Sequence, residues 1–300
     1  MATPAFKELV DLAVRVTSRP EHHHRYIDLV EARLKEAQRE LFEGVETERY
    51  GRYVLRDLAL KCSPMIFHKG EKLIIGGTQE ASATLIVDGL VRIYREEKTG
   101  AFGWRTAAWF GVRGPGAHVG VPTAILEEKH FYTCEACSEC SVFLIPHKDF
   151  YDAHAASPQL ARNVLRAFNT RYRAEVEDRD VMLHLKKEAD RAVFMFLVIA
   201  RAIGDPNADR DADEPDEYRP GDPQPPYVLD WLDIETLAKY IGIERESLGV
   251  FLRSLFYESA NYKGAVSLGK QDARGHYRGP LSIVKLQPLR DYIALQLRKD

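Results

Sequence analysis

Residues 232–255 read LDIETLAKYIGIERESLGVFLRSL, a pattern of two short helices separated at Gly242. Apolar residues recur at helical spacing on both sides of the glycine: Ile234, Leu237, Ile241, Leu248, Leu252 and Leu255. Glycine supplies the backbone freedom that a tight turn between two angled helices requires. The stretch therefore predicts a helix-turn-helix, whose second helix has the size to enter the major groove of DNA.

The opposite face of the second predicted helix carries Arg245, Glu246 and Arg253. Ser247, Gly249 and Val250 are further candidate DNA-contacting residues on this helix. Arginine can hold guanine through two hydrogen bonds, glutamate can accept one from cytosine, and valine can contact a thymine methyl group. We expect Arg245 and Glu246 to read bases and Ser247 to contact the DNA backbone. The alternative is that Arg245 and Glu246 are only solvated charges in a first helical turn.

The segment resembles the DNA-binding end of the Crp–Fnr superfamily of bacterial transcription regulators. The likeness rests on Leu237-Ala238, Ile241-Gly242, Arg245-Glu246-Ser247 and 248–255, without gaps. Relatives of the catabolite activator type carry a second arginine four residues after the glutamate, where this chain has Val250. The resemblance covers about residues 60–295. It implies a homodimer that binds a near-palindromic site in double-stranded DNA and works with RNA polymerase.

The residues after the helix-turn-helix predict a wing, which completes a winged helix-turn-helix domain at 230–300. Residues 264–268 and 281–286 suit two strands, and the loop 269–279 between them carries Lys270, Arg274 and Arg278. A basic loop beside a recognition helix is suited to phosphate contacts. This domain has eleven Lys and Arg against nine Asp and Glu, a net charge of +2, although the whole chain has −3. Local rather than average charge governs affinity for phosphates.

Residues 61–156 predict a jelly-roll-like β-roll, which makes the fold class α+β. Short segments with strand composition alternate with glycine-containing turns. The sequences HKGEKLI, LIVDGLVRIY and PGAHVG resemble the cyclic-nucleotide-binding domain of the same superfamily. The region is accordingly expected to be a sensor domain.

The positions that hold the nucleotide in those relatives have different residues here. Val121 follows Gly120 where a glutamate binds the ribose, and His130 and Phe131 stand where an arginine and a serine hold the phosphate. Valine cannot accept a hydrogen bond and phenylalanine cannot donate one. Four residues thus mark the candidate effector pocket, and we expect that cAMP is not its ligand.

Three closely spaced cysteines, Cys134, Cys137 and Cys140, allow three interpretations. They could hold an iron–sulfur cluster or zinc, since members of the Fnr branch sense oxygen through such clusters. They could form a thiol redox switch, or they could be ordinary small residues in and beside strands. A metal would need a fourth ligand. Cys62 is expected to lie far from Cys140, which leaves His118 and His130 as candidates.

Residues 157–203 are expected to form one long helix that begins with Ser157 as its N-cap and carries the dimer seam. The alternative is a domain-packing helix without dimerisation. The apolar stretch 192–202 should be buried against the winged-helix domain. Residues 204–229 contain six prolines and a net charge of −6, which predicts a linker without secondary structure.

Residues 1–60 have helical periodicity and predict an N-terminal helical extension about forty residues longer than is usual in the superfamily. The run His22–His24 is interpreted as solvated, because adjacent residues on a helix point in different directions. With 45% hydrophobic residues and no apolar run long enough to span a membrane, the chain is expected to be cytoplasmic. No catalytic motif appears, so an enzyme is not expected.

Overall fold

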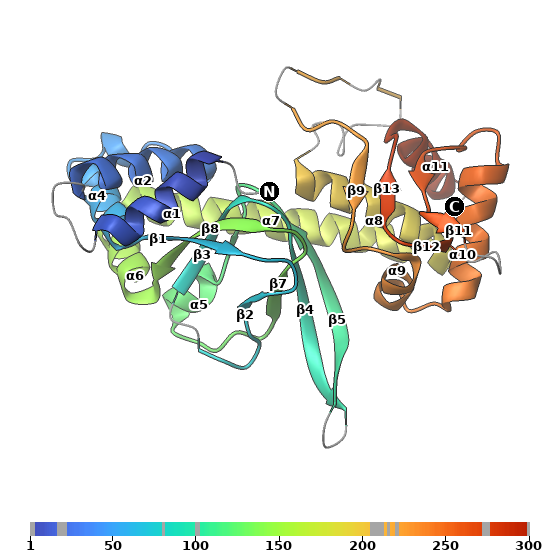
Figure 1. The fold of residues 1–300 in the computed structure, drawn as a ribbon, viewed down its shortest axis with the longest axis horizontal. Helices are drawn as coiled ribbons and strands as arrows, with labels where there is room; N and C mark the ends of the chain where they lie inside the picture. Colours follow the sequence, from blue (N-terminus) through green and yellow to red (C-terminus); the bar gives the residue numbers. More distant parts are fainter. Residues whose placement is uncertain are drawn as a thin grey trace. The chain divides into compact units, whose positions relative to one another are not determined.

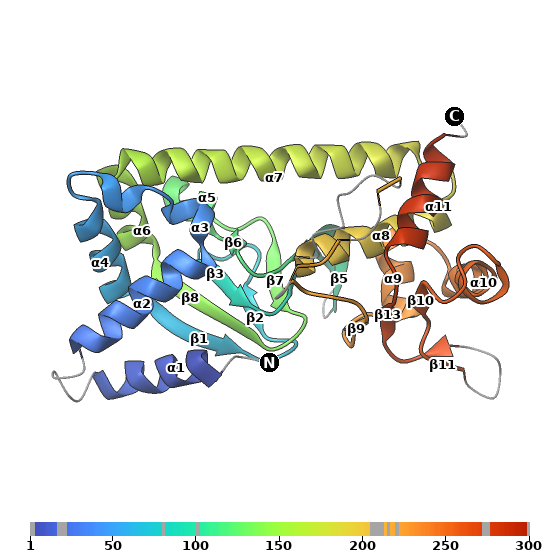
Figure 2. The same cartoon turned by 90° about the horizontal axis from the view of Figure 1, so that it is seen from above.

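A computed structural model describes residues 4–16, 23–79, 82–99, 103–204, 213–214, 217–219, 222–271 and 277–298. The chain divides into two compact units, Met1–Arg173 and Ala174–Asp300. Figures 1 and 2 label their elements. No helix in the described ranges is both long and apolar enough to cross a bilayer.

The first unit contains an N-terminal helical layer, a β-roll, one helix that follows it and the start of a longer helix. The N-terminal layer comprises α1 (Pro4–Val16), α2 (His23–Ala37), α3 (Arg39–Phe42), the 3-10 turn η2 (Val45–Thr47) and α4 (Gly51–Lys61). The roll comprises β1 (Ser63–Phe67), β2 (Lys72–Ile74), β3 (Ser82–Asp88), β4 (Val91–Thr99), β5 (Gly103–Arg113), β6 (His118–Val119), α5 (Val121–Leu126), β7 (Thr133–Ala136) and β8 (Cys140–Pro146). The helix α6 (His147–Ala156) follows, and α7 (Pro158–His184) begins in the first unit and ends in the second.

The β-roll consists of two antiparallel sheets with the strand orders β1-β8-β3-β6 and β2-β7-β4-β5. Residues such as Ile74, Ile93 and Val142 fill the space between the sheets. The predicted β-roll is confirmed, although β6 and β7 were not predicted as strands. The sequence of β7, TCEA, is too short and too polar to give a clear strand pattern.

The helical layer covers the outer face of the sheet that contains β8. Phe143 and Ile145 of β8 pack in one core with Phe6, Leu34 and Leu58 of the N-terminal helices. The rings of Phe6 and Phe143 lie 5.4 Å apart. Because β8 is buried on both faces, residues 142–145 form a continuous apolar run, VFLI. The N-terminal extension is therefore part of the same folded unit as the β-roll.

The helix α7 begins as the sequence predicts, with help from the N-terminal layer. The Ser157 hydroxyl accepts a hydrogen bond from the Leu160 N–H at 3.0 Å and donates to the Glu48 carboxylate at 2.5 Å. The other Glu48 oxygen accepts from the Gln159 N–H at 2.8 Å. A carboxylate at a helix N-terminus satisfies unpaired N–H groups and complements the helix dipole.

The single helix predicted over 157–203 is instead two helices, α7 and α8 (Glu188–Ile203). The chain leaves helical conformation after His184, and α8 reverses direction, as Figure 2 shows. Asp178 of α7 accepts two hydrogen bonds from Arg201 of α8, at 2.7 and 2.9 Å. Glu188 and Asp190 in the first turn favour a new helix start there. The apolar pattern continues across this break, so periodicity alone could not locate it.

The second unit also contains two helices joined by a tight turn, a small sheet, a β-ribbon and a closing helix. Its elements are β9 (Tyr227–Leu229), α9 (Ile234–Ile241), α10 (Arg245–Arg253), the π turn η3 (Ser254–Glu258), β10 (Val266–Ser267), β11 (Lys270–Gln271), β12 (Tyr277–Arg278), β13 (Leu281–Ile283) and α11 (Gln287–Leu297). The sheet order is β10-β13-β9, and β11 pairs with β12. The expected linker 204–229 is thus corrected at its end, where Tyr227 and Leu229 are buried in a strand.

The apolar helix α8 is buried in this second unit, as predicted. Ala192, Val193 and Phe196 are almost fully buried. The Phe196 ring lies 6.3 Å from the Phe256 ring, and Asp190 accepts a hydrogen bond from the Tyr292 hydroxyl at 2.7 Å.

Candidate nucleic-acid interface and effector region

The turn between α9 and α10 follows the predicted glycine signal. The Asp233 carboxylate caps α9 by accepting from the Thr236 N–H at 2.7 Å. Gly242 ends α9 at φ 85° and ψ 28°, a left-handed conformation that glycine adopts without strain. The Gly242 and Ile243 N–H groups both donate to the Ala238 carbonyl, at 2.9 and 3.1 Å. The two helices are therefore fixed at an angle over a short turn, an arrangement consistent with a helix-turn-helix.

The helix α10 places its leucines inside and its predicted DNA-contacting residues outside. Leu248 and Leu252 are fully buried, whereas Val250 is 70% exposed. Glu246, Ser247 and Arg253 are exposed, and Arg245 and Gly249 are partly exposed. The predicted residues of α10 thus share one accessible face.

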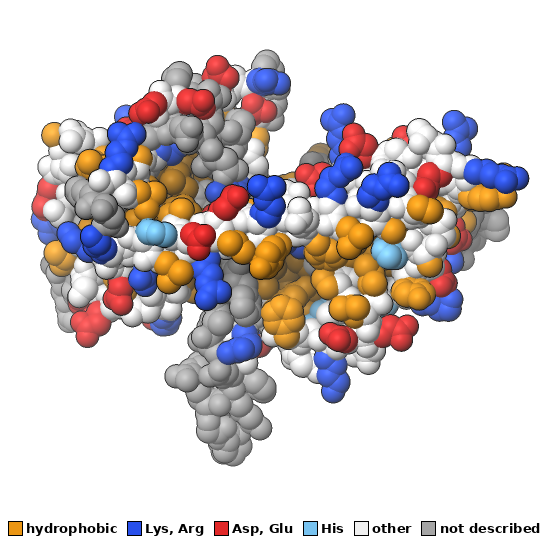
Figure 3. All heavy atoms as spheres, turned by 180° about the vertical axis from the view of Figure 1, so that it is seen from behind, with side chains coloured by type: hydrophobic (Ala, Val, Ile, Leu, Met, Phe, Trp, Pro, Cys, Tyr) orange, Lys and Arg blue, Asp and Glu red, His pale blue; other side chains and the backbone are white. Residues whose placement is uncertain are grey.

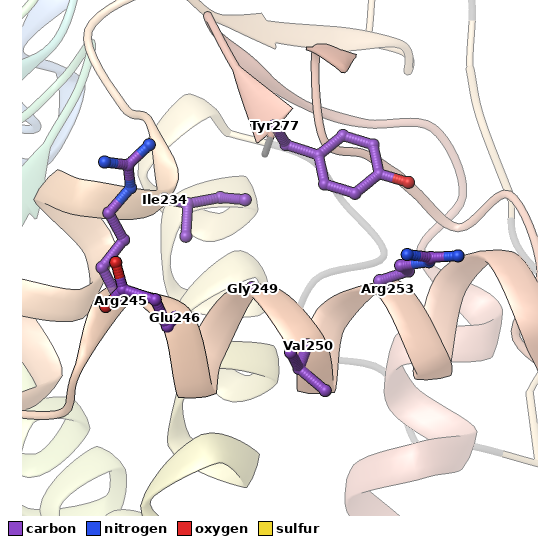
Figure 4. Close-up of a pocket in the computed structure, with 7 residues that line it drawn as sticks. All are labelled: Ile234, Arg245, Glu246, Gly249, Val250, Arg253 and Tyr277. Carbon is purple, nitrogen blue, oxygen red and sulfur yellow. The ribbon is translucent and has the colours of Figure 1, made fainter. Parts of the chain in front are cut away.

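This face borders a shallow concavity that also involves two residues not predicted from the sequence. Arg245, Glu246, Gly249, Val250 and Arg253 line it together with Ile234 and Tyr277. Figure 4 shows Arg245 and Arg253 extending from the two ends of α10 and Tyr277 facing the concavity from β12. The Arg253 Nε lies 3.2 Å from a Glu258 carboxylate oxygen, which offsets part of the positive charge at that end.

The predicted wing is a short β-ribbon whose base contacts the end of the helical segment. Lys270 pairs with Arg278 across the ribbon, and the Lys270 side chain is exposed. The Tyr257 and Tyr277 rings lie 5.4 Å apart, and the Tyr257 hydroxyl accepts from the Leu268 N–H at 3.3 Å. Arg274 lies outside the described residues, and Arg278 is described only in its backbone on β12. An aromatic residue on the ribbon and another after α10 could have suggested this contact.

The candidate effector pocket is occupied by side chains of the chain itself. Gly120 forms the N-cap of α5, and its N–H donates to the Tyr132 hydroxyl at 3.0 Å. Val121 is fully buried, and His130 is only 1% exposed. Phe131, by contrast, is 67% exposed, and its ring lies 5.0 Å from that of Tyr132. The sequence did not predict Tyr132, because its contact with Gly120 depends on the path of the loop between α5 and β7.

Burial keeps the histidines of this region neutral. The Thr123 hydroxyl lies 3.0 Å from His130 Nδ1, and the His147 ring centroid lies 6.1 Å from that of His130. Burial, together with the neighbouring His147, lowers the pKa of His130, and burial lowers the pKa of His147. Burial and the nearby Arg171 hold the pKa of His118 well below its usual value. Neutral imidazoles offer little attraction to a cyclic phosphate.

The three clustered cysteines are all buried and free of disulfide bonds. Cys134 faces Ile74 and Ile93 in the sheet register, and Cys140 donates a hydrogen bond to the Leu90 carbonyl at 3.2 Å. Burial raises the pKa of the Cys137 thiol well above its usual value and that of Cys140 to about 11. Burial therefore disfavours the thiolate form that fast redox exchange requires.

The described residues include no group of three or more His, Cys, Asp or Glu side chains placed to hold a metal ion. Cys62, as expected, lies far from Cys140, because Ser63 pairs with Leu144 whereas Cys140 pairs with Phe67 at the other end of β1. The residues therefore do not fit the iron–sulfur cluster or zinc site that the cysteine spacing suggested.

Comparisons with known proteins agree with this architecture. Residues 64–157 match the family model of the cyclic nucleotide-binding domain. A transcriptional regulator of the CRP/FNR family from Eubacterium rectale shares 16% identity, covers 86% of this chain and 99% of its own, and has a TM-score of 0.55. The fold is that of the Crp–Fnr regulators. No curated protein matches the chain in sequence.

Two further regulators with this fold align over most of their length. A CRP/FNR-family regulator from Thermus thermophilus shares 15% identity over 77% of this chain and 98% of its own, with a TM-score of 0.51. FixK2 from Bradyrhizobium japonicum shares 16% identity over 77% and 96%, with a TM-score of 0.50. The sensor-like roll and the C-terminal helical region of this chain are therefore the parts of a known two-part architecture.

Proposed function

We propose that this chain is a sequence-specific DNA-binding transcription regulator that acts as a homodimer and does not respond to cAMP. The observation that carries the proposal is the accessible polar face of α10. The leucines on the opposite face of this helix are buried and hold it in place. Arg245 and Glu246 read base edges, while Ser247, Lys270 and the ribbon contact phosphates. RNA polymerase is the expected partner at a promoter, on the resemblance to the Crp–Fnr superfamily.

An exposed apolar stripe along α7 supports the dimer. Leu165, Tyr172, Val176 and Leu183 are exposed and lie seven, four and seven residues apart. Figure 3 shows hydrophobic side chains gathered along the face that carries this helix. This spacing is the heptad seam of a two-stranded coiled coil. Phe168 and Leu185 do not belong to this stripe, because they pack within their own units.

The proposal that cAMP does not regulate this chain is based on the residues at the start of α5. A cyclic nucleotide would need an acceptor for its ribose and donors for its phosphate, but Val121 is apolar and Tyr132 already takes the Gly120 N–H. Replacing that internal hydrogen bond would leave a buried hydroxyl or N–H unsatisfied, which is unfavourable.

The test is selection of binding sites from a pool of random DNA duplexes with the purified full-length chain, in the presence and absence of cAMP. We expect an inverted repeat whose half-sites are centred about one helical turn, or ~10 base pairs, apart, and no effect of cAMP. Failure to enrich any sequence would overturn the DNA-binding assignment. Enrichment of a single unrepeated half-site would overturn the dimer.

A further inference from the structure

A cavity of ≈ 450 Å³ lies in the first unit between the N-terminal helices and the β-roll, away from the Gly120–His130 group. Its walls include Phe6 of α1, Arg33 and Ala37 of α2, Val87 and Asp88 of β3, and Ser141 of β8. This volume is within the range of small-molecule sites in proteins. Figure 2 shows α1 and α2 on the side of the roll that carries β8 and β3, the elements that supply these residues.

Hydrogen bonds fix the two sides of the cavity to each other. The Gln38 side-chain amide, directly after Ala37, donates to the Ile86 carbonyl at 3.0 Å and to the Ala117 carbonyl at 3.2 Å. The Gly116 N–H also donates to the Ile86 carbonyl, at 3.0 Å. The end of α2 is thereby held against the roll, so the cavity is preformed.

Buried polar atoms at this junction lack hydrogen-bond partners within the described residues. The Ser141 hydroxyl is fully buried on the cavity wall and has none, and the adjacent Gln38 has an unpartnered carbonyl oxygen. Buried polar groups in folded proteins are almost always satisfied. An unpartnered hydroxyl that lines a cavity therefore points to a polar ligand.

The charged groups of the cavity define which ligand it suits. One Asp88 carboxylate oxygen accepts from the Gly89 N–H at 2.8 Å, and the other has no partner among the described residues. Arg33 donates one N–H to Glu36 at 2.6 Å and has further N–H groups available. With Arg33, Glu36 and Asp88, the lining carries a net charge of −1 beside the apolar Phe6 and Val87.

We propose that this cavity binds a small molecule that carries a primary ammonium group on an apolar body. The ammonium group is held by Asp88 and Ser141, and the apolar body lies against Phe6 and Val87. Both α-amino acids and simple amines offer this chemistry, but only an amino acid supplies a carboxylate for Arg33. The site lies in the first unit. Binding to it does not depend on DNA, so it can be tested without DNA.

The test is isothermal titration calorimetry of the full-length chain with three compounds that share one apolar body: L-phenylalanine, phenethylamine and 3-phenylpropanoate. The series of L-leucine, isoamylamine and 4-methylpentanoate repeats it with a smaller body. We expect the ammonium compounds of at least one series to bind and the carboxylates without ammonium not to bind. No binding by any ammonium compound, or equal binding by the carboxylates, would overturn the proposal.

Variants assign the binding to this cavity. Asp88→Asn keeps the side-chain shape and should weaken ammonium binding by about tenfold or more, whereas exposed Asp11→Asn on α1 should leave it unchanged. Ala37→Leu fills the cavity and should abolish binding, with thermal unfolding used to check that the variant folds. Arg33→Gln separates the two ligand sources, since it should weaken the amino acid but not the amine. Unchanged binding in both Asp88→Asn and Ala37→Leu would overturn the site.

Discussion

The starts of α5 and α10 are the two helix N-termini at which the sequence predicts an effector pocket and DNA contacts, and they differ sharply. At α5, Val121 and His130 are buried and the Gly120 N–H is taken by Tyr132. At α10, Glu246 and Ser247 are exposed above buried leucines. The start of α10 is thus accessible, whereas side chains of the chain itself fill the space around the start of α5. Similarity of fold alone therefore does not establish which ligand this chain binds.

The largest expected effect comes from restoring the acidic residue that nucleotide-binding relatives have at the start of α5. Val121→Glu places an uncompensated carboxylate in a fully buried position. It should lower the free energy of unfolding by about 3 kcal/mol or more, measured by urea denaturation, and should not confer cAMP binding. The matched control is Leu126→Glu, which is exposed on the same helix and should change stability little. A stable Val121→Glu variant that binds cAMP would show that the two helix starts do not differ as described.

The next effect concerns the stripe on α7 that we assign to the dimer. Tyr172→Asp introduces a charge in the middle of that stripe and should weaken dimerisation by about 2 kcal/mol, or roughly 30-fold, in sedimentation experiments. Thr170→Asp, exposed on α7 but off the stripe, is the control. Equal dimer affinity in both variants would remove α7 from the interface.

Acidification should affect the buried region of the roll. The lowered pKa of His118, His130 and His147 means that, below pH ~6.5, the unfolded chain binds protons that the folded chain does not. Their stabilisation is present above pH ~6.5 and is lost as pH falls through the folded pKa values, by at most about 1.4 kcal/mol per pH unit for each histidine. Denaturation at pH 7 and pH 5.5 measures the slope. His130→Gln should make it shallower and exposed His68→Gln should not; identical slopes would contradict this.

The smallest effect is expected at the ribbon beside α10. Lys270→Ala removes one phosphate contact, so it should weaken binding to all sequences alike and reduce the slope of log affinity against log salt by about one. Lys148→Ala, on α6 in the first unit, is the control. A change in base preference in Lys270→Ala would mean that the ribbon reads sequence rather than phosphates.

The accuracy of the sequence-based predictions followed from how local the determining interactions are. The α9–α10 pair was predictable because helical spacing and a glycine with positive φ are local signals. The break after His184 was not predictable. Because α8 is apolar on nearly every side, its sequence shows no change of the apolar face that would separate it from α7. The expected loss of a nucleotide contact at Val121 also rested on a single local residue, and it stays a prediction. The hydrogen bond between Gly120 and Tyr132 and the packing of the N-terminal helices on β8 were not predicted. Both depend on contacts between separate parts of the chain.

The central claim is that Arg245 reads a base, and the most direct test compares the wild-type chain with Arg245→Ala on a selected duplex in which each base pair of the half-site is varied in turn. We predict that the variant loses about 1–3 kcal/mol on the preferred site and loses its preference at one base pair while keeping it at the others. The same base preferences and affinity in both proteins would contradict the claim.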